Sequence, residues 1–170
     1  MKTLPPTGPR IDDPIEMLRA CHEKVRRFAT LAQRLRDHVA VHGADAEARS
    51  AAEAVLRYFD LAAVLHHEDE ECDLFPALRE AGDAALVQAI DQLHAEHEVL
   101  TQTWQRVRPW LLAVAQGGQV QAAPEVDAFA QSYCRHADRE EAEIYPHAGL
   151  LQAERTRAIC DAMVARRTQP

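Results

Sequence analysis

Apolar residues recur at steps of three and four through most of the chain, which is the spacing of one face of a helix. The clearest stripe lies within residues 86–114 and comprises Leu86, Ile90, Leu93, His97, Leu100, Trp104, Val107, Leu111 and Val114. Similar stripes run within residues 15–32, 55–74 and 126–144. The pattern therefore predicts four long amphipathic helices packed around one core.

Start and stop signals set the expected bounds of the first two helices. An aspartate at position 12 or 13, directly before Pro14, is expected to cap the first helix, which Gly43 ends. The second helix is expected over residues 45–74, because Pro76 should break it before a short turn that ends near Gly82.

The rest of the chain predicts three more helices. Asp83 is placed to cap a third helix that reaches about residue 116, with a kink expected at Pro109. A fourth starts near Pro124 and loses regularity at residues 146–149, and a shorter fifth over 151–165 should pack outside. The prediction is an all-α, up-down-up-down four-helix bundle over residues 14–148, with an irregular arm (1–13) before it and a C-terminal helix (149–170) after it.

Composition supports the helical prediction and narrows the partners. The chain has 170 residues, 47% of them apolar, 5% aromatic and only six of them glycine, which suits one helical domain. A net charge of −8 with interleaved signs offers no basic face to nucleic acid or to an anionic membrane. There is no apolar stretch of the roughly 18 to 20 residues that a membrane span needs, and no secretory signal. We expect a cytoplasmic protein.

Polar residues occupy inward positions on all four predicted helices. His22 and His97 lie in the apolar stripes of the first and third helices, and the stripes of the second and fourth carry histidine followed by glutamate. The four cysteines are scattered singly, without a Cys-x-x-Cys pair. The histidines and glutamates are therefore the chemistry that the core must accommodate.

An internal repeat sets the register of these residues. The motif His-x-x-x-Glu-Glu-x-x-Leu/Ile-Phe/Tyr-Pro begins at His66 and again at His136, an offset of 70 residues. The repeat pairs His66 and Glu70 with His136 and Glu140, and it predicts that His67 and Glu71 point aside.

Histidine and glutamate four residues apart share one helix face and can bind the same metal centre. Two such helices and two lone histidines supply four imidazoles and two carboxylates, which a core tolerates only with added positive charge. Carboxylates can bridge two cations, and imidazole with carboxylate but no thiolate suits non-haem iron better than structural zinc. The residues thus predict a dinuclear iron site.

The ordered set of His, His-x-x-x-Glu, His and His-x-x-x-Glu resembles the hemerythrin-like, or HHE cation-binding, family. The resemblance covers residues 14–146. It implies an oxo- or hydroxo-bridged di-iron centre, with bridging carboxylates from Glu70 and Glu140 and terminal ligands His22, His66, His97 and His136. It also implies reversible oxygen binding, or reaction with oxygen, nitric oxide or peroxide, at an open iron position.

This sequence departs from the oxygen-carrying members of that family. They have a further histidine four residues before the one on the third helix, where this chain has Leu93, and their final carboxylate follows the last histidine by five residues instead of four. His94 is a candidate for the missing nitrogen, and a solvent-exposed position for His94, with water or an exogenous ligand on the metal, is the alternative.

Three functions follow from these expectations. The first is a protein that binds or senses oxygen, nitric oxide or peroxide, or handles iron, with a protein partner or a second copy of the chain to pass on a signal. The second is an enzyme that acts on peroxide or nitric oxide at the same centre. The third is a redox-silent zinc or mixed-metal bundle.

Overall fold

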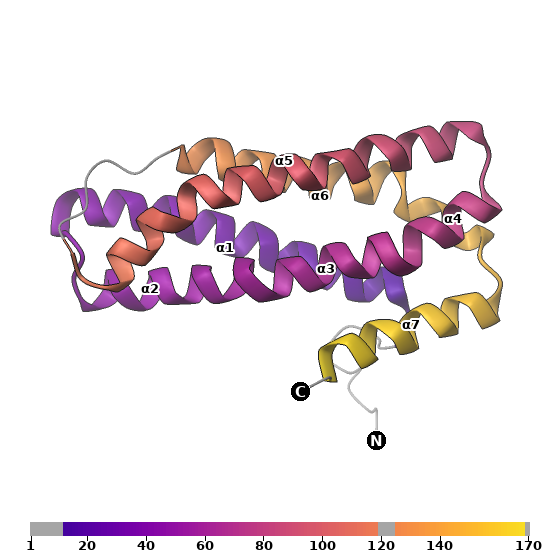
Figure 1. The fold of residues 1–170 in the computed structure, drawn as a ribbon, viewed down its shortest axis with the longest axis horizontal. Coiled ribbons are helices and arrows are strands. Elements are labelled where there is room, and N and C mark those ends of the chain that lie inside the picture. Colours follow the sequence, from indigo (N-terminus) through magenta and orange to yellow (C-terminus); the bar gives the residue numbers. More distant parts are fainter. Residues whose placement is uncertain (1–11, 119–124, 169–170) are drawn as a thin grey trace, which may run out of the picture.

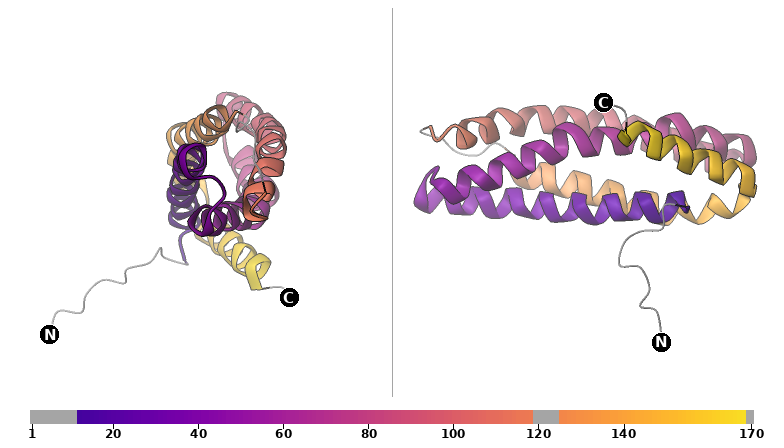
Figure 2. Two further views of the ribbon diagram at one scale, coloured as in Figure 1. Left: turned by 90° about the vertical axis from the view of Figure 1, so that its left-hand side faces the viewer. Right: turned by 90° about the horizontal axis from the view of Figure 1, so that it is seen from below.

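The computed structural model describes residues 12–118 and 125–168, and in that part of the chain the helical segments run back and forth along the long axis, which is horizontal in Figure 1. The bundle consists of α1 (Pro14–His42), α2 (Ala46–Arg57), α3 (Ala63–Asp69), α4 (Phe75–Ala81), α5 (Ala84–Ala115) and α6 (Val126–Glu143). Because α2, α3 and α4 follow one line, the bundle has four columns. They surround a common centre, and α7 (Ala153–Thr168) lies outside them (Figure 2). The predicted all-α fold is confirmed.

Aspartate caps start the helices where the sequence places them. The Asp13 carboxylate accepts hydrogen bonds from the backbone N–H groups of Ile15 and Glu16, at 2.9 and 3.2 Å. Asp45 and Asp83 cap α2 and α5 in the same way. Gly43 ends α1 with a positive φ of 70°, a conformation that glycine adopts without strain. Most of the predicted N-terminal arm and the predicted start near residue 124 lie outside the described residues.

Two π-helical turns interrupt the second column: η1 (Tyr58–Ala62) and η2 (Glu70–Leu74). A π turn holds more residues than an α turn, so each rotates the residues that follow it relative to an unbroken α-helix. The prediction that Pro76 breaks this helix was wrong, since helical structure continues to Ala81. Pro76 lies in the first turn of α4, where its missing N–H is tolerated.

The proline inside the third column has a milder effect. α5 continues through Pro109 to Ala115, and its C-terminal part slopes toward α2 in Figure 1. After α6 the chain forms the 3-10 helix η3 (Tyr145–Leu150), where the sequence predicts a loss of regularity.

The core consists of two apolar clusters with a polar layer between them. On α1, Leu18 belongs to one cluster and Val25 to the other, with His22 between them. On α5, Leu93 and Leu100 have the same relation to the buried histidine that separates them. The polar layer therefore crosses the bundle at one depth.

The outer helix α7 contacts α1, α3 and η2. It buries Ile159, Cys160 and Met163 against the bundle, and two arginines of its last turn pair with a buried carboxylate of the bundle. Asp69, at the end of α3, is fully buried and ion-paired with both Arg166 and Arg167. Two guanidinium groups from α7 thus compensate a carboxylate next to the polar layer. Among the described residues, no helix combines the length and the apolar composition needed to cross a membrane.

Candidate metal centre

The structure brings the six predicted ligand side chains together in the polar layer. All six are buried, and the two carboxylates, Glu70 and Glu140, have no exposed surface. The imidazoles come from all four columns: His22, His66, His97 and His136. Their role as ligands stays a prediction.

The donor atoms form two groups, each compact enough for a cation. His22, His66, Glu70 and Glu140 offer atoms that lie within 4.8 Å of one another. The second group consists of His67, His97 and His136, by the same criterion. Two adjoining groups match the predicted dinuclear arrangement.

The inward position of His67 contradicts the expectation that it points aside. Its ring stacks on that of His97 with centroids 3.9 Å apart and is only partly exposed. The π turn η1 rotates α3, so that both His66 and His67 reach the interior. One feature of the sequence is consistent with this inward position. The counterpart of His67 in the repeat is the apolar residue Ala137, and Ala137 is buried.

His94, the predicted candidate for an extra nitrogen, lies at the edge of the centre. Its side chain is 46% exposed, and its Nε2 atom lies 3.8 Å from a carboxylate oxygen of Glu71. It belongs to neither donor group. The structure thus offers His67, and not His94, as the source of a fifth imidazole.

Glu140 spans the two groups with its two oxygens. Oε2 lies 3.2 Å from Nε2 of His22, in the first group. Oε1 lies 3.0 Å from Nε2 of His136 and 3.5 Å from Nε2 of His97, in the second. Glu70 also lies between the groups, because its Oε2 is 3.6 Å from Nε2 of both His66 and His97. These contacts suit carboxylates that bridge two cations.

The outward nitrogens of three imidazoles are held by further carboxylates. Nδ1 of His22 bonds Glu141 at 2.9 Å, and Nδ1 of His97 bonds Glu71 at 2.6 Å. The two glutamates, Glu141 and Glu71, occupy the same position of the repeat. Nδ1 of His136 bonds Glu96 at 2.9 Å. Such bonds orient an imidazole and leave its Nε2 free to bind a metal.

Tyr145 is a member of the site that the sequence analysis did not identify. Its hydroxyl donates to Oε1 of Glu70 at 2.8 Å and lies 3.2 Å from Nε2 of His22. Its ring stacks on that of His22. The repeat contained a signal, since the position of Tyr145 is Phe75 in the first copy, and packing alone does not require the hydroxyl.

Burial and mutual contact shift the ionisation of these groups. Burial lowers the pKa of His66 and of His67 well below the usual range, and the neighbouring histidines add to the effect. Burial raises the pKa of Glu70 well above its usual value, and the charge of Glu140 raises it further. Burial acts the same way on Glu140, but its contacts with His136 and the other imidazoles outweigh it and hold the pKa well below normal. The lowered pKa values of His66 and His67 favour the neutral imidazole, which is the form that binds a metal.

Unsatisfied polar atoms show that the residues fit a cation. Within the described residues, buried atoms without a hydrogen-bond partner include Oε2 of Glu70, both carboxylate oxygens of Glu140, and Nε2 of His97 and His136. Lone pairs that converge in the core without a donor are costly. A metal ion would satisfy them and balance the carboxylate charge.

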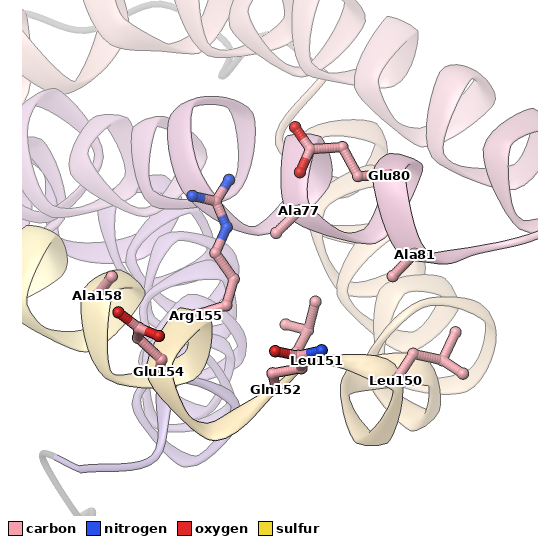
Figure 3. Close-up of a pocket in the computed structure, with 9 residues that line it drawn as sticks. All are labelled: Ala77, Glu80, Ala81, Leu150, Leu151, Gln152, Glu154, Arg155 and Ala158. Atoms are coloured by element: carbon pink, nitrogen blue, oxygen red, sulfur yellow. The ribbon is translucent and has the colours of Figure 1, made fainter.

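Two cavities show which side of the layer is accessible. A cavity of about 360 Å³ opens beside α3 and α5 and is lined by Val64, His67, Glu68, Glu71, His94, His97, Glu98 and Thr101. A larger one, about 490 Å³, lies between α4, the end of η3 and α7, where Arg155 reaches from α7 toward α4 (Figure 3). None of the residues that line the larger cavity is a donor of either group. The smaller cavity is lined by the donors His67 and His97, so it is the one of these two that reaches the donor groups.

Comparison with known proteins agrees with this geometry. An uncharacterised protein of Haemophilus influenzae is 37% identical to the chain over 131 residues, which is 76% of each protein. The sequence profile of the hemerythrin HHE cation binding domain matches residues 13–148, a span that contains both donor groups and Tyr145. The chain belongs to the hemerythrin family of HHE cation-binding domains.

Proposed function

We propose that this protein holds a non-haem di-iron centre that binds or senses dioxygen, nitric oxide or peroxide. The observation that carries the proposal is the pair of adjoining donor groups with Glu140 spanning them. Five imidazoles and two carboxylates form the set, and among the described residues no thiol belongs to it. Imidazole and carboxylate without thiolate favour iron over structural zinc.

The number of donors favours a reactive centre over a purely structural one. Three imidazoles and two bridging carboxylates supply five protein atoms to one ion, and two imidazoles with the same carboxylates supply four to the other. Octahedral iron takes about six ligands, so positions remain for exogenous ligands. The cavity that ends at His67 and His97 gives a small molecule a route to the centre.

The metal is tested by elemental analysis of protein made in iron-replete cells. We expect close to two iron ions per chain, and His97→Ala should reduce this content. His42→Ala, at an exposed histidine, is the matched control and should leave it unchanged. Iron near zero with stoichiometric zinc would overturn the proposal.

The reaction is tested by mixing the reduced protein, kept free of oxygen, with dioxygen or nitric oxide while the visible spectrum is recorded. A reversible charge-transfer band supports binding or sensing. Sustained consumption of peroxide or nitric oxide over many turnovers would instead establish an enzyme.

A further inference from the structure

We infer that the phenol oxygen of Tyr145 is a protein ligand of the ion held by His22 and His66. The inference rests on the proposed di-iron centre and adds a donor of a type that the histidine and carboxylate motif does not contain.

The distances around His22 place the Tyr145 oxygen among the donors. Nε2 of His22 lies 3.1 Å from Nε2 of His66 and 3.2 Å from Oε2 of Glu140. The Tyr145 oxygen is also 3.2 Å from that nitrogen, and it is 2.8 Å from Oε1 of Glu70. Neighbouring donors on one octahedral ion with bonds of about 2.1 Å are separated by about 3.0 Å. The phenol oxygen therefore stands at the separation expected for a ligand of the same ion.

The repeat shows that packing does not account for this hydroxyl. Phe75, the counterpart of Tyr145, lies against His97 with its ring nearly parallel and 5.9 Å away, and it packs there without a polar atom. Both aromatic side chains are buried. A buried hydroxyl is unfavourable unless it is bonded, and the groups that the Tyr145 hydroxyl contacts are two predicted ligands, Glu70 and His22.

The number of donors in each group explains why a phenol oxygen would be needed as a ligand. The donor group of His67, His97 and His136 has three imidazoles, whereas the other group has two. With Tyr145 each ion has five protein donors, once the carboxylates are shared. Phenolate is a hard oxygen donor that suits ferric iron, and tyrosine serves as an iron ligand in some haem proteins. When it binds, its O–H bond breaks, an oxygen–iron bond forms and one proton is released to solvent.

The experiment uses the colour of a ferric phenolate. The full chain is loaded with ferrous iron without oxygen, oxidised with ferricyanide and desalted, and its visible and resonance Raman spectra are recorded. We expect a phenolate-to-iron charge-transfer band with enhanced tyrosine ring vibrations. Tyr145→Phe, which installs the side chain found at the counterpart position, should fold, retain iron and lose the band.

The chain supplies two matched controls, because it has three tyrosines. Tyr58 and Tyr133 are buried like Tyr145, but their hydroxyls donate to the backbone carbonyls of Cys21 and Leu100. Tyr58→Phe and Tyr133→Phe should therefore keep the band.

The outcomes separate this inference from the proposed function. A wild-type protein that holds two ferric ions without the band, or a band that survives in iron-loaded Tyr145→Phe, overturns the ligand role and leaves the di-iron proposal intact. A protein that takes up no iron overturns both. Circular dichroism and iron content of Tyr145→Phe show whether a lost band reflects a lost ligand or an unfolded chain, and only a folded, iron-loaded variant without the band supports the inference.

Discussion

The two halves of the centre use different side chains although the repeat makes their helices equivalent. One half has His67, His97 and His136 with Phe75 against them, and the other has two imidazoles and the phenol of Tyr145. His67 corresponds in the repeat to Ala137, so the third imidazole exists in one copy only. If both proposals hold, the exchange of an imidazole in one half for a phenol in the other would give the two ions unlike surroundings.

The halves also differ in how firmly their imidazoles are oriented. Nδ1 of His136 bonds Glu96, which also pairs with Arg139. Nδ1 of His66 is buried and has no hydrogen-bond partner among the described residues. The lone histidines of α1 and α5, His22 and His97, follow Cys21 and Glu96 respectively, so only one half has a carboxylate at the preceding position. The half with Glu96 should therefore hold its ion more firmly.

The largest expected effect comes from a residue that both halves share. Glu140→Ala should remove both ions, because each carboxylate oxygen contacts a different donor group. It should lower the free energy of unfolding of the metal-loaded protein by about 3 kcal/mol or more for each ion lost. Metal analysis and thermal melts measure this, with the exposed Glu53→Ala as control. Retention of two ions by Glu140→Ala would show that the halves are independent sites.

The next effect should be confined to one half. His67→Ala removes an imidazole from the group with three and should reduce the metal content from about two ions toward one. His94→Ala is the matched control, because this histidine is near but outside both donor groups. Titration of metal-free protein with ferrous iron gives both stoichiometries. Equal losses from the two variants would mean that the half with three imidazoles has been assigned incorrectly.

Replacing a carboxylate that bonds the outward nitrogen of an imidazole should have a smaller effect on metal binding. The effect should appear in the half that contains Glu96 and be slight in the half that has Cys21 instead. Glu96→Gln weakens the bond that orients His136 and should lower metal affinity about 10- to 100-fold. Cys21→Ala, at the equivalent position, should change it little, since Cys21 occupies the place of the missing carboxylate. Competition with a chelator measures both affinities. A larger loss from Cys21→Ala would reverse the order of the halves.

The smallest expected difference is in the rates at which the two ions leave the protein. On addition of excess chelator to the iron-loaded protein, the ion near His22 and His66 should leave first, because His66 lacks an outer partner. The phenolate band assigned to Tyr145 should accordingly fade before half of the iron has been removed. Parallel loss of band and iron would indicate that both ions leave at the same rate.

Much of the fold was predictable because it depends on local rules. The stripe from Leu86 to Val114 and the aspartate caps determine helices whose bounds differ from the predicted ones by few residues. Pro76 was misjudged because its effect depends on the turn before it. A proline is disruptive inside an α-helix but tolerated in its first turn. Because the π turn η2 ends at Leu74, α4 begins at Phe75, one residue before Pro76.

The site was predictable where the two copies of the repeat agree. His66 and Glu70 agree with His136 and Glu140, and the structure brings all four together. It was missed where the copies differ. His67 depends on a local rotation that apolar periodicity does not record, and the role of Tyr145 depends on which atom its hydroxyl reaches across the bundle.

The pairing of Asp69 with two arginines of α7 affects how the protein can be shortened. The family match ends at residue 148, so a fragment cut there contains every donor discussed above but lacks Arg166 and Arg167. That fragment would lose both ion pairs of Asp69 and the apolar contacts that Ile159 and Met163 make with the bundle, and both losses should lower its stability. The segment after residue 148 thus stabilises α3, the helix that carries His66 and His67. Truncation at the domain boundary should yield a marginally stable protein.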